Sequence, residues 1–156
     1  MVQNPPEGSQ RILPYLNYSD PMAAIEFLKS AFGFKQGLLL EMPDGNIGHC
    51  ELQMGGETLM LAGEFAEGGL SSPKSLGGVH ASVVVYVDDL DAHCERARAA
   101  GAQIVQEPED QFYGDRTYRA LDPEGVGWDF HQHVRDVTPE EMMAAMSEPP
   151  AGGVNQ

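Results

Sequence analysis

Two pairs of ionisable residues stand at strand-like i, i+2 spacing in this chain of 156 residues. His49 and Glu51 form one pair, and Asp129 and His131 form the other. Because side chains alternate along a strand, the members of each pair share one face of a sheet. Two imidazoles and two carboxylates could hold a divalent metal ion, or Glu51 or Asp129 could move protons on a bound substrate. Local hydrogen bonding is the alternative for the histidines, and pairing with Arg119 is the alternative for Asp129.

The first of these pairs lies in a predicted hairpin over residues 48–63. A two-residue loop of Gly55 and Gly56 opposes Met54 to Glu57 and fixes which side chains share a face. One face is then uniformly apolar and is expected to pack under a helix, while the other would line a concavity. The apolar face carries Cys50, Leu52, Leu59 and Leu61, and the concave face carries His49, Glu51, Gln53 and Met60.

The second pair lies in a predicted hairpin over residues 115–134, closed by the turn DPEG at 122–125. A three-residue loop that ends in a left-handed Gly125 opposes Asp122 to Val126. A two-residue loop would instead slip the register by one residue and exchange the two faces. The three-residue loop predicts a core of Tyr118, Trp128 and Phe130, with Phe112 also assigned to it, and a concave face of Thr117, Arg119, Asp129 and His131.

Each hairpin closes one copy of a repeated module. A shift of 68 residues aligns the two halves of the chain. It matches Asp20 with Asp88, where a helix N-cap is expected, and Gly33 with Gly101, where each helix is expected to end. Strand-like runs precede both caps, and strands follow both glycines. We therefore predict an α+β fold of two β-α-β-β-β modules in tandem, whose concave mixed sheet encloses a pocket and carries the helices on its outer face.

These modules divide the chain. We expect a flexible N-terminus, two modules joined by a glycine-rich linker, and an appended short helix with a disordered tail. The appended helix begins with the capping box Thr138-Pro139-Glu140-Glu141, and its methionines would pack on the same chain or on a second protomer. The N-terminus is expected over residues 1–10, the first module over 11–63 and the linker over 64–78. The second module is expected over 79–134, and the appended helix with its tail over 135–156.

The composition narrows the range of partners. Nine Lys and Arg against 24 Asp and Glu give a net charge of −15, which repels nucleic acid and anionic membrane surfaces. The chain shows no apolar stretch of about 18 residues and no secretory signal, so we expect a cytoplasmic protein. Cys50 and Cys94 match no zinc-binding spacing, and we interpret both as reduced core thiols.

The paired modules resemble the vicinal oxygen chelate superfamily. Two stretches carry the resemblance, PYLNYSDPMAAIEFLKSAFGF at 14–34 and FYGDRTYRALDPEGVGWDF at 112–130. The superfamily includes glyoxalase I, extradiol dioxygenases, fosfomycin-resistance thiol transferases and bleomycin-binding resistance proteins. The likeness is greatest to the PhnB-like subgroup and covers about residues 11–134. It implies a homodimer.

Metal-dependent members of that superfamily hold a divalent ion at four positions. Carried over residue by residue, these positions are Leu13, Met60, Ser82 and Asp129. Leucine has no donor atom, a thioether is soft and a neutral hydroxyl is weak, so three of the four do not suit a hard or borderline cation. The resemblance therefore implies no metal and no other cofactor here, unless His49, Glu51, Asp129 and His131 rebuild a displaced site.

We predict a metal-independent protein that binds a small organic ligand in the concavity, as bleomycin-resistance proteins do. The alternative is a metal-dependent lyase or dioxygenase that uses the displaced site. A third hypothesis is acid-base chemistry without a metal, by Glu51 or Asp129. Tyr15 and Tyr113 join the expected ligand contacts because they lie near a strand start and in a loop. The full predicted set is Leu13, Tyr15, His49, Glu51, Met60, Ser82, Tyr113, Thr117, Arg119, Asp129 and His131.

Overall fold

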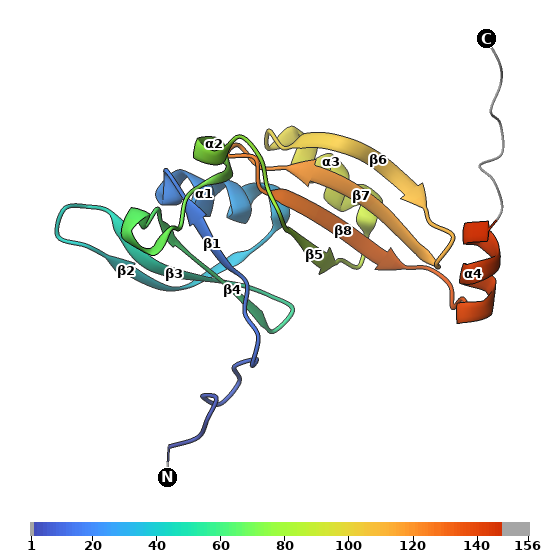
Figure 1. The fold of residues 1–156 in the computed structure, drawn as a ribbon, viewed down its shortest axis with the longest axis horizontal. Helices are drawn as coiled ribbons and strands as arrows, with labels where there is room; N and C mark the ends of the chain where they lie inside the picture. Colours follow the sequence, from blue (N-terminus) through green and yellow to red (C-terminus); the bar gives the residue numbers. More distant parts are fainter. Residues whose placement is uncertain (1, 148–156) are drawn as a thin grey trace.

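Two four-stranded mixed sheets form the protein, and each is built by one half of the chain (Figure 1). The structure, a computed structural model, describes residues 2–147. In each sheet the first strand of the module lies parallel to the last, and the remaining neighbours are antiparallel. The predicted fold of two β-α-β-β-β modules in tandem is therefore confirmed. The predicted disorder of residues 148–156 lies outside the described residues.

The first module has the sheet order β1-β4-β3-β2. Its helix α1 continues directly into a π-helical turn, η1. The elements are β1 (Tyr15–Tyr18), α1 (Pro21–Phe27), η1 (Leu28–Phe32), β2 (Lys35–Glu41), β3 (Ile47–Met54) and β4 (Glu57–Gly63).

The second module repeats this order as β5-β8-β7-β6. A folded segment links the two modules, with a short 3-10 helix η2 (Ala66–Gly68) and a single helical turn α2 (Pro73–Leu76). The elements of the second module are β5 (Ser82–Tyr86), α3 (Leu90–Ala99), β6 (Gln103–Asp110), β7 (Asp115–Leu121) and β8 (Gly127–His133).

The N-cap of the second helix corrects one prediction. The side chain of Asp89, not Asp88, accepts a hydrogen bond from the Ala92 amide, as the side chain of Asp20 does from Ala23 in the first module. The repeat is therefore offset by 69 residues at the caps and by 68 at the two left-handed glycines. The π-helical turn η1 supplies the difference, because it holds one more residue than an α-helical turn would.

Both hairpins have the predicted register. Met54 pairs with Glu57 across the Gly55-Gly56 loop, and Tyr118 pairs with Phe130 in the second hairpin. Gly125 has φ of 92°, the left-handed conformation that the three-residue loop requires. The apolar and polar faces of each hairpin are thus assigned correctly.

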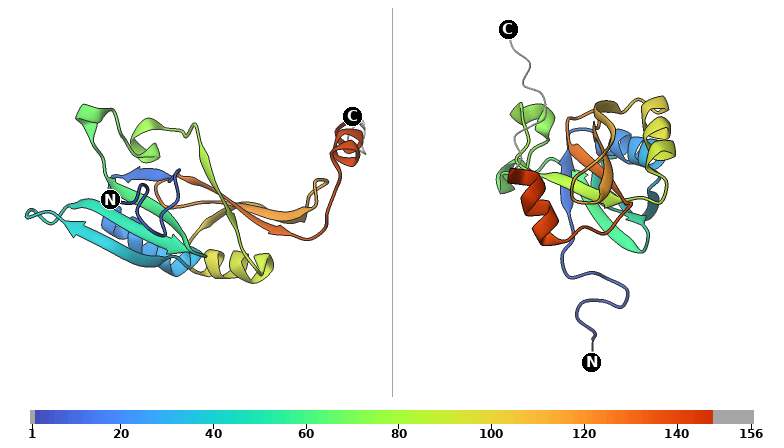
Figure 2. Two further views of the ribbon diagram at one scale, coloured as in Figure 1. Left: turned by 90° about the horizontal axis from the view of Figure 1, so that it is seen from below. Right: turned by 90° about the vertical axis from the view of Figure 1, so that its right-hand side faces the viewer.

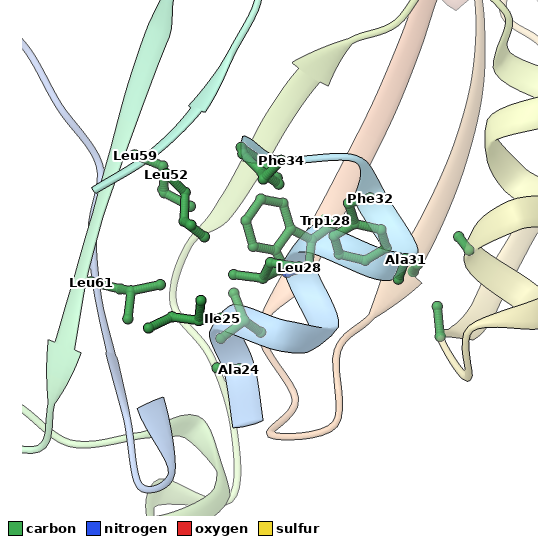
Figure 3. Close-up of a cluster of buried hydrophobic side chains, with 14 of the residues drawn as sticks. Ala24, Ile25, Leu28, Ala31, Phe32, Phe34, Leu52, Leu59, Leu61 and Trp128 are labelled. Atoms are coloured by element: carbon green, nitrogen blue, oxygen red, sulfur yellow. The ribbon is translucent and has the colours of Figure 1, made fainter. Parts of the chain in front are cut away.

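The two modules share one aromatic core (Figure 3). Ile25, Leu28 and Phe32 lie on one side of the first helix and of η1, and all three are fully buried. The ring centroid of Phe32 lies 5.2 Å from that of Trp128 and 4.8 Å from that of Phe130. The aromatic face of the second hairpin is therefore buried as predicted, but it packs on the end of the first helix as well as on α3. Phe112 is 43% exposed, so its assignment to the core was wrong.

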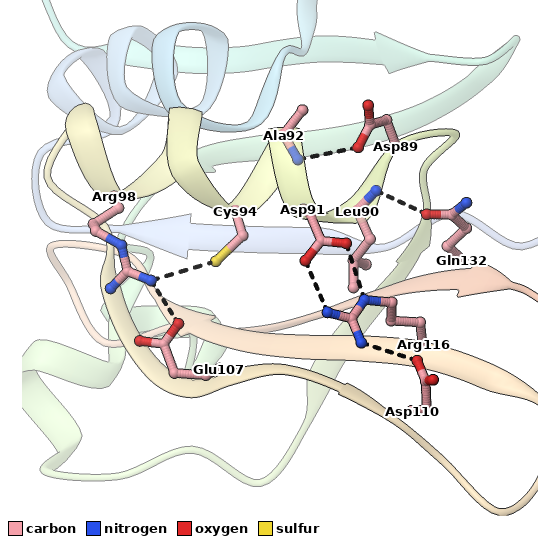
Figure 4. A network of polar contacts seen from close by, with 10 residues as sticks. All are labelled: Asp89, Leu90, Asp91, Ala92, Cys94, Arg98, Glu107, Asp110, Arg116 and Gln132. Carbon is pink, nitrogen blue, oxygen red and sulfur yellow. Dashed lines mark hydrogen bonds and ion pairs between the residues drawn. The ribbon is translucent and has the colours of Figure 1, made fainter.

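Helix α3 is tied to its own sheet by ion pairs (Figure 4). Arg116 on β7 contacts Asp91 on the helix and Asp110 on β6, each at 2.9 Å. Arg98 contacts Glu107 at 2.6 Å. Such exposed pairs contribute little each, so the buried face of the helix supplies most of its attachment.

A polar junction fixes one module against the other. We define the module junction as Tyr18, Ser19, Asp20, Ser72, Asp122 and Glu124. The Tyr18 hydroxyl donates to Asp122 at 2.7 Å, and the Trp128 indole donates to the same oxygen at 3.2 Å. The Glu124 carboxylate accepts four hydrogen bonds of 2.6–2.9 Å, from Ser19 (amide and hydroxyl), Ser72 (hydroxyl) and Asp20 (amide). Every donor to Glu124 lies outside its own module.

Helix α4 (Pro139–Ser147) extends from the far end of the second sheet, away from the rest of the protein (Figure 2). Its predicted capping box forms, since Thr138 and Glu141 exchange hydrogen bonds between side chain and amide. Met143 and Met146 are exposed. No helix in the described part of the chain is long and apolar enough to span a membrane.

The module junction generates a stability prediction. Glu124→Ala should lower the free energy of unfolding by about 1–3 kcal/mol, because it leaves the buried hydroxyl of Ser72 and the partly buried donors of Ser19 and Asp20 without an acceptor. Glu67→Ala, an exposed glutamate in η2, is the control and should change it by less than about 0.5 kcal/mol. Urea denaturation at neutral pH measures both, and equal stabilities of the two variants would contradict the prediction.

The loss of unfolding free energy caused by Glu124→Ala should depend on pH. Burial alone would raise the pKa of Glu124, but its hydrogen bonds from Ser19, Ser72 and Asp20 outweigh burial and lower it. Because the folded pKa lies below the unfolded value, the ionised carboxylate stabilises the fold fully above the ordinary glutamate pKa of about 4.3, and this contribution is lost as the pH falls through the lowered value. The difference between wild type and Glu124→Ala should therefore shrink on acidification.

Candidate functional site

Each sheet leaves one face free of helices, and these two open faces carry the predicted site residues of the strands. Helices α1 and α3 cover the opposite faces, and η1 contacts α3 between the modules (Figure 2). In the first sheet, Tyr15, Met60 and Glu51 lie side by side across β1, β4 and β3, with His49 beside Leu40 of β2. We call this set the first open face.

A hollow of about 610 Å³ lies over the same side of this sheet, and Tyr15 is the residue of the first open face that lines it. Tyr15, Asn17 and Ala62 form part of its floor, and Phe65 and Leu70 of the linking segment form part of its wall. This volume is in the range of sites for drug-sized organic molecules. The linking segment therefore shapes a cavity as well as joining the modules.

His49 lies beside this hollow with both ring nitrogens near a partner. Its Nδ1 lies 3.0 Å from the Tyr15 hydroxyl, and its Nε2 lies 3.6 Å from Glu51 Oε1. The carboxylate favours the proton on Nε2, so Nδ1 accepts a hydrogen bond from Tyr15. Partial burial raises the pKa of Tyr15, which keeps its hydroxyl protonated. The group thus offers a ligand a fixed aromatic ring and a carboxylate.

The second open face lies on the other sheet. Val84, Asp129 and Arg119 form one row across β5, β8 and β7, and Tyr86 and His131 begin the next. Arg119 Nε lies 2.5 Å from Asp129 Oδ1, so the expected ion pair is present and occupies the Asp129 carboxylate. Thr117 lies opposite His131 but is buried, and its hydroxyl accepts from Gln106 at 3.3 Å.

A buried carboxylate organises the end of this face. Asp115 is 5% exposed and accepts from the Tyr86 hydroxyl at 2.8 Å, from His131 Nδ1 at 2.9 Å and from His133 Nδ1 at 2.8 Å. Burial alone would raise the pKa of Asp115, but these three donors outweigh burial and lower it. His133 Nε2 also contacts Asp136, and its two carboxylate partners raise the pKa of His133.

The four inherited metal positions do not suit a cation. Leu13 precedes β1 and Met60 lies on the first open face, whereas Ser82 and Asp129 lie on the other sheet. Three of these side chains are poor donors, and Asp129 is paired with Arg119. Among residues 2–147, no group of three or more His, Cys, Asp and Glu side chains could hold a metal ion. The displaced set of His49, Glu51, Asp129 and His131 is thus not assembled within one chain.

Sequence reasoning missed the residues around His131. Asp115 directly opposes His133 in the confirmed hairpin register, and Tyr86 lies beside His131 in the parallel pair of β5 and β8. Extending the register to the strand ends would have found Asp115. Finding Tyr86 would have required knowing that β5 pairs with β8, and no local sequence pattern reveals that pairing. Tyr113, which was predicted, stacks on His131 with ring centroids 6.3 Å apart.

Known proteins with similar sequences and structures identify the family of this chain. The model of the Glyoxalase/Bleomycin resistance protein/Dioxygenase superfamily matches residues 10–130. The chain belongs to this superfamily. Its two tandem β-α-β-β-β modules are consistent with the fold of this superfamily, which is also called vicinal oxygen chelate.

Individual relatives support this membership. An uncharacterized protein of Mycobacterium tuberculosis is 39% identical over 137 residues, which cover 86% of this chain and 81% of that protein. The crystal structure of TioX from Micromonospora sp. ML1 is 34% identical and has a TM-score of 0.65 over 81% of this chain and 100% of that one. TnmS3 from Streptomyces sp. CB03234, described as an antibiotic binding protein, is 22% identical with a TM-score of 0.62 over 80% of this chain and 96% of that one.

The Asp115 cluster generates a second stability prediction. Asp115→Asn should lower the free energy of unfolding by about 1–3 kcal/mol, because the amide turns a donor toward His131, Tyr86 or His133. Asp110→Asn is the matched control in an exposed ion pair and should cost less than about 1 kcal/mol. Thermal and urea denaturation compare the two, and a larger loss for Asp110→Asn would count against the prediction.

The effect of Asp115→Asn should also shrink at high pH. Hydrogen bonds to Asp115 and Asp136 raise the pKa of His133, so its protonated ring stabilises the fold fully below the ordinary histidine pKa of about 6.5. That contribution is lost as the pH rises through the raised value. Denaturation series across neutral pH would show whether the gap between wild type and Asp115→Asn narrows.

Proposed function

We propose that this protein binds a small organic ligand on its open sheet faces without a metal ion. The hollow beside the first open face carries this proposal, since it has the volume for a drug-sized molecule and is lined by aromatic, apolar and amide side chains together with the Glu64 carboxylate and the Ser19 hydroxyl. The poor donors at Leu13, Met60 and Ser82 favour binding without a metal. The description of TnmS3 as an antibiotic binding protein supports a ligand of that kind.

We propose that a second copy of the chain completes the site. Apolar side chains on both open faces are exposed, with Leu40 at 51%, Val84 at 54% and Tyr86 at 61%. Apolar surface gathered on one face of a sheet is typical of a covered surface. A second copy that laid its first open face on this second open face would bury both sets. The site would then lie between the two copies of a homodimer.

Two finer assignments belong to the same proposal. The PhnB-like subgroup rests on the residues of 14–34 and 112–130. A cytoplasmic location rests on Cys50 and Cys94, which are both buried and unpaired and so suit a reducing compartment.

Ligand titration tests the proposed binding. A panel of amphipathic antibiotics, titrated calorimetrically into chelator-treated protein, should contain ligands whose affinity does not change when Zn²⁺ or Ni²⁺ is added back. Arg119→Ala should weaken such binding at least about tenfold, a loss of about 1.4 kcal/mol. Arg98→Ala, an arginine of α3 in a similar exposed ion pair, is the control and should bind like wild type. Affinity that appears only with added metal would contradict metal-independent binding.

The proposed dimer is tested separately. Light scattering after gel filtration should give twice the mass of the 16.9 kDa chain. Val84→Glu should shift the population toward the monomer, because it places a charge in the centre of the covered surface. Val2→Glu is the control, since Val2 is exposed in the N-terminal segment. A wild-type monomer at micromolar concentration would refute the dimer, whether or not ligand binds.

A further inference from the structure

Two hydroxyl groups line the hollow beside the first open face, and both already use their proton inside the protein. The Tyr15 hydroxyl donates to His49 Nδ1 at 3.0 Å, and the Ser19 hydroxyl donates to the Glu124 carboxylate at 2.6 Å. A hydroxyl has one proton to donate but keeps lone pairs that can accept. Toward a ligand, Tyr15 and Ser19 therefore act as hydrogen-bond acceptors.

The two side-chain amides that line the hollow are held in one orientation. Asn17 Nδ2 donates to the Gly63 carbonyl at 2.9 Å, and Asn46 Nδ2 donates to the Asp44 carboxylate at 2.8 Å. Because a carbonyl and a carboxylate only accept, these contacts identify which atom of each amide is the nitrogen. Neither Oδ1 atom has a partner among residues 2–147, so the amides add two more acceptors and keep one free N–H each.

Glu64 gives the hollow its only formal charge within the described part of the chain, where no Lys, Arg or His lines it. The Ser72 amide and the Ser75 hydroxyl both donate to Glu64 Oε1 at 2.8 Å, whereas Oε2 has no hydrogen-bond partner among residues 2–147. These two bonds lower the pKa of Glu64, so its carboxylate is ionised at neutral pH. The hollow thus presents a negative charge that no lining side chain neutralises.

An aromatic ring lies next to this carboxylate in the chain. Phe65 lines the hollow and is held by the paired backbone of Phe65 and Leu70. A Cβ atom at Gly68 would overlap the Phe65 ring, so the ring lies directly against that glycine. Aromatic faces attract cations, and Tyr15 contributes a second ring to the same hollow.

From these contacts we propose that the hollow takes an organic cation, an amphipathic amine whose ammonium group donates to Glu64 and to the neighbouring acceptor oxygens. Its apolar body lies on Phe65 and Leu70. The net charge of −15 attracts such a ligand and repels an anion of the same shape. This inference rests on the proposed ligand-binding function and names the chemical class of its ligand.

Two dyes that differ in charge test the inference. Dansylcadaverine carries a primary ammonium group at neutral pH, and its N-acetyl derivative has the same fluorescent body without the charge. In fluorescence titrations, wild-type protein should bind the cationic dye at least about fivefold more tightly than the acetylated dye. Added salt should reduce this difference, because it screens the attraction between the ammonium group and a solvent-accessible carboxylate.

One substitution removes the charge and keeps the local structure. In Glu64→Gln an amide oxygen can still accept from Ser72 and Ser75, so the linking segment should keep its fold. This variant should bind the cationic dye about as weakly as the acetylated one, and its affinity for the acetylated dye should not change. Glu67→Gln is the matched control, since Glu67 is exposed in the same segment and does not line the hollow. It should bind both dyes like wild type.

Equal affinity of wild-type protein for the two dyes would overturn the inference, and this comparison needs no variant. A preference for the cationic dye that persists in Glu64→Gln, or that Glu67→Gln reduces equally, would overturn it as well. If the antibiotics bind while dansylcadaverine does not, the inference is wrong but the proposed binding function stands. If neither the antibiotics nor the dyes bind, both are wrong.

Discussion

The carboxylates of Asp122 and Glu124 hold the two modules in a fixed relation, and the shared core depends on that relation. Both belong to one four-residue turn of the second module, yet Asp122 accepts from Tyr18 on β1, and Glu124 accepts from residues before α1 and in the linking segment. Burial in the junction raises the pKa of Asp122 in spite of its hydrogen bonds. This turn sets the position at which Phe32 meets Trp128 and Phe130, together with the hydrogen bonds that join His93 and Arg96 of α3 to the backbone carbonyls of η1.

The arrangement of the modules determines what kind of site the protein can have. Packing of η1 on α3 joins the helical layers of the two modules, and the two open sheet faces are left uncovered as a consequence. Neither face alone encloses a ligand completely. The two faces also differ in their side chains, because the first face offers a hollow and a carboxylate, while the second offers an ion pair and a histidine held by Asp115.

Much of the fold could be predicted because the turns carry strong local signals. Gly55-Gly56 and the DPEG turn fix two registers, and each register assigns a whole face. The N-cap at Asp89 was missed because the neighbouring Asp88 suits an N-cap equally well. In addition, no residue pattern indicates the extra residue of the π-helical turn η1. Asp115 was missed because an aspartate at a strand start is typical of turns, and its partners come from β5 and β8. How the modules pack on each other depends on long-range contacts such as His93 to Phe32, which periodicity does not encode.

The linking segment connects the hollow to the module junction through a single residue. Ser72 donates its hydroxyl to Glu124 at 2.6 Å and its amide to Glu64 at 2.8 Å, and the segment between Glu64 and Ser72 contains Phe65 and Leu70 of the cavity wall. The position of the cavity wall and the attachment of the modules therefore both depend on Ser72. A lineage that widened this cavity by loosening the segment would weaken the whole fold, so specificity here is expected to evolve through the floor residues on the strands rather than through the wall.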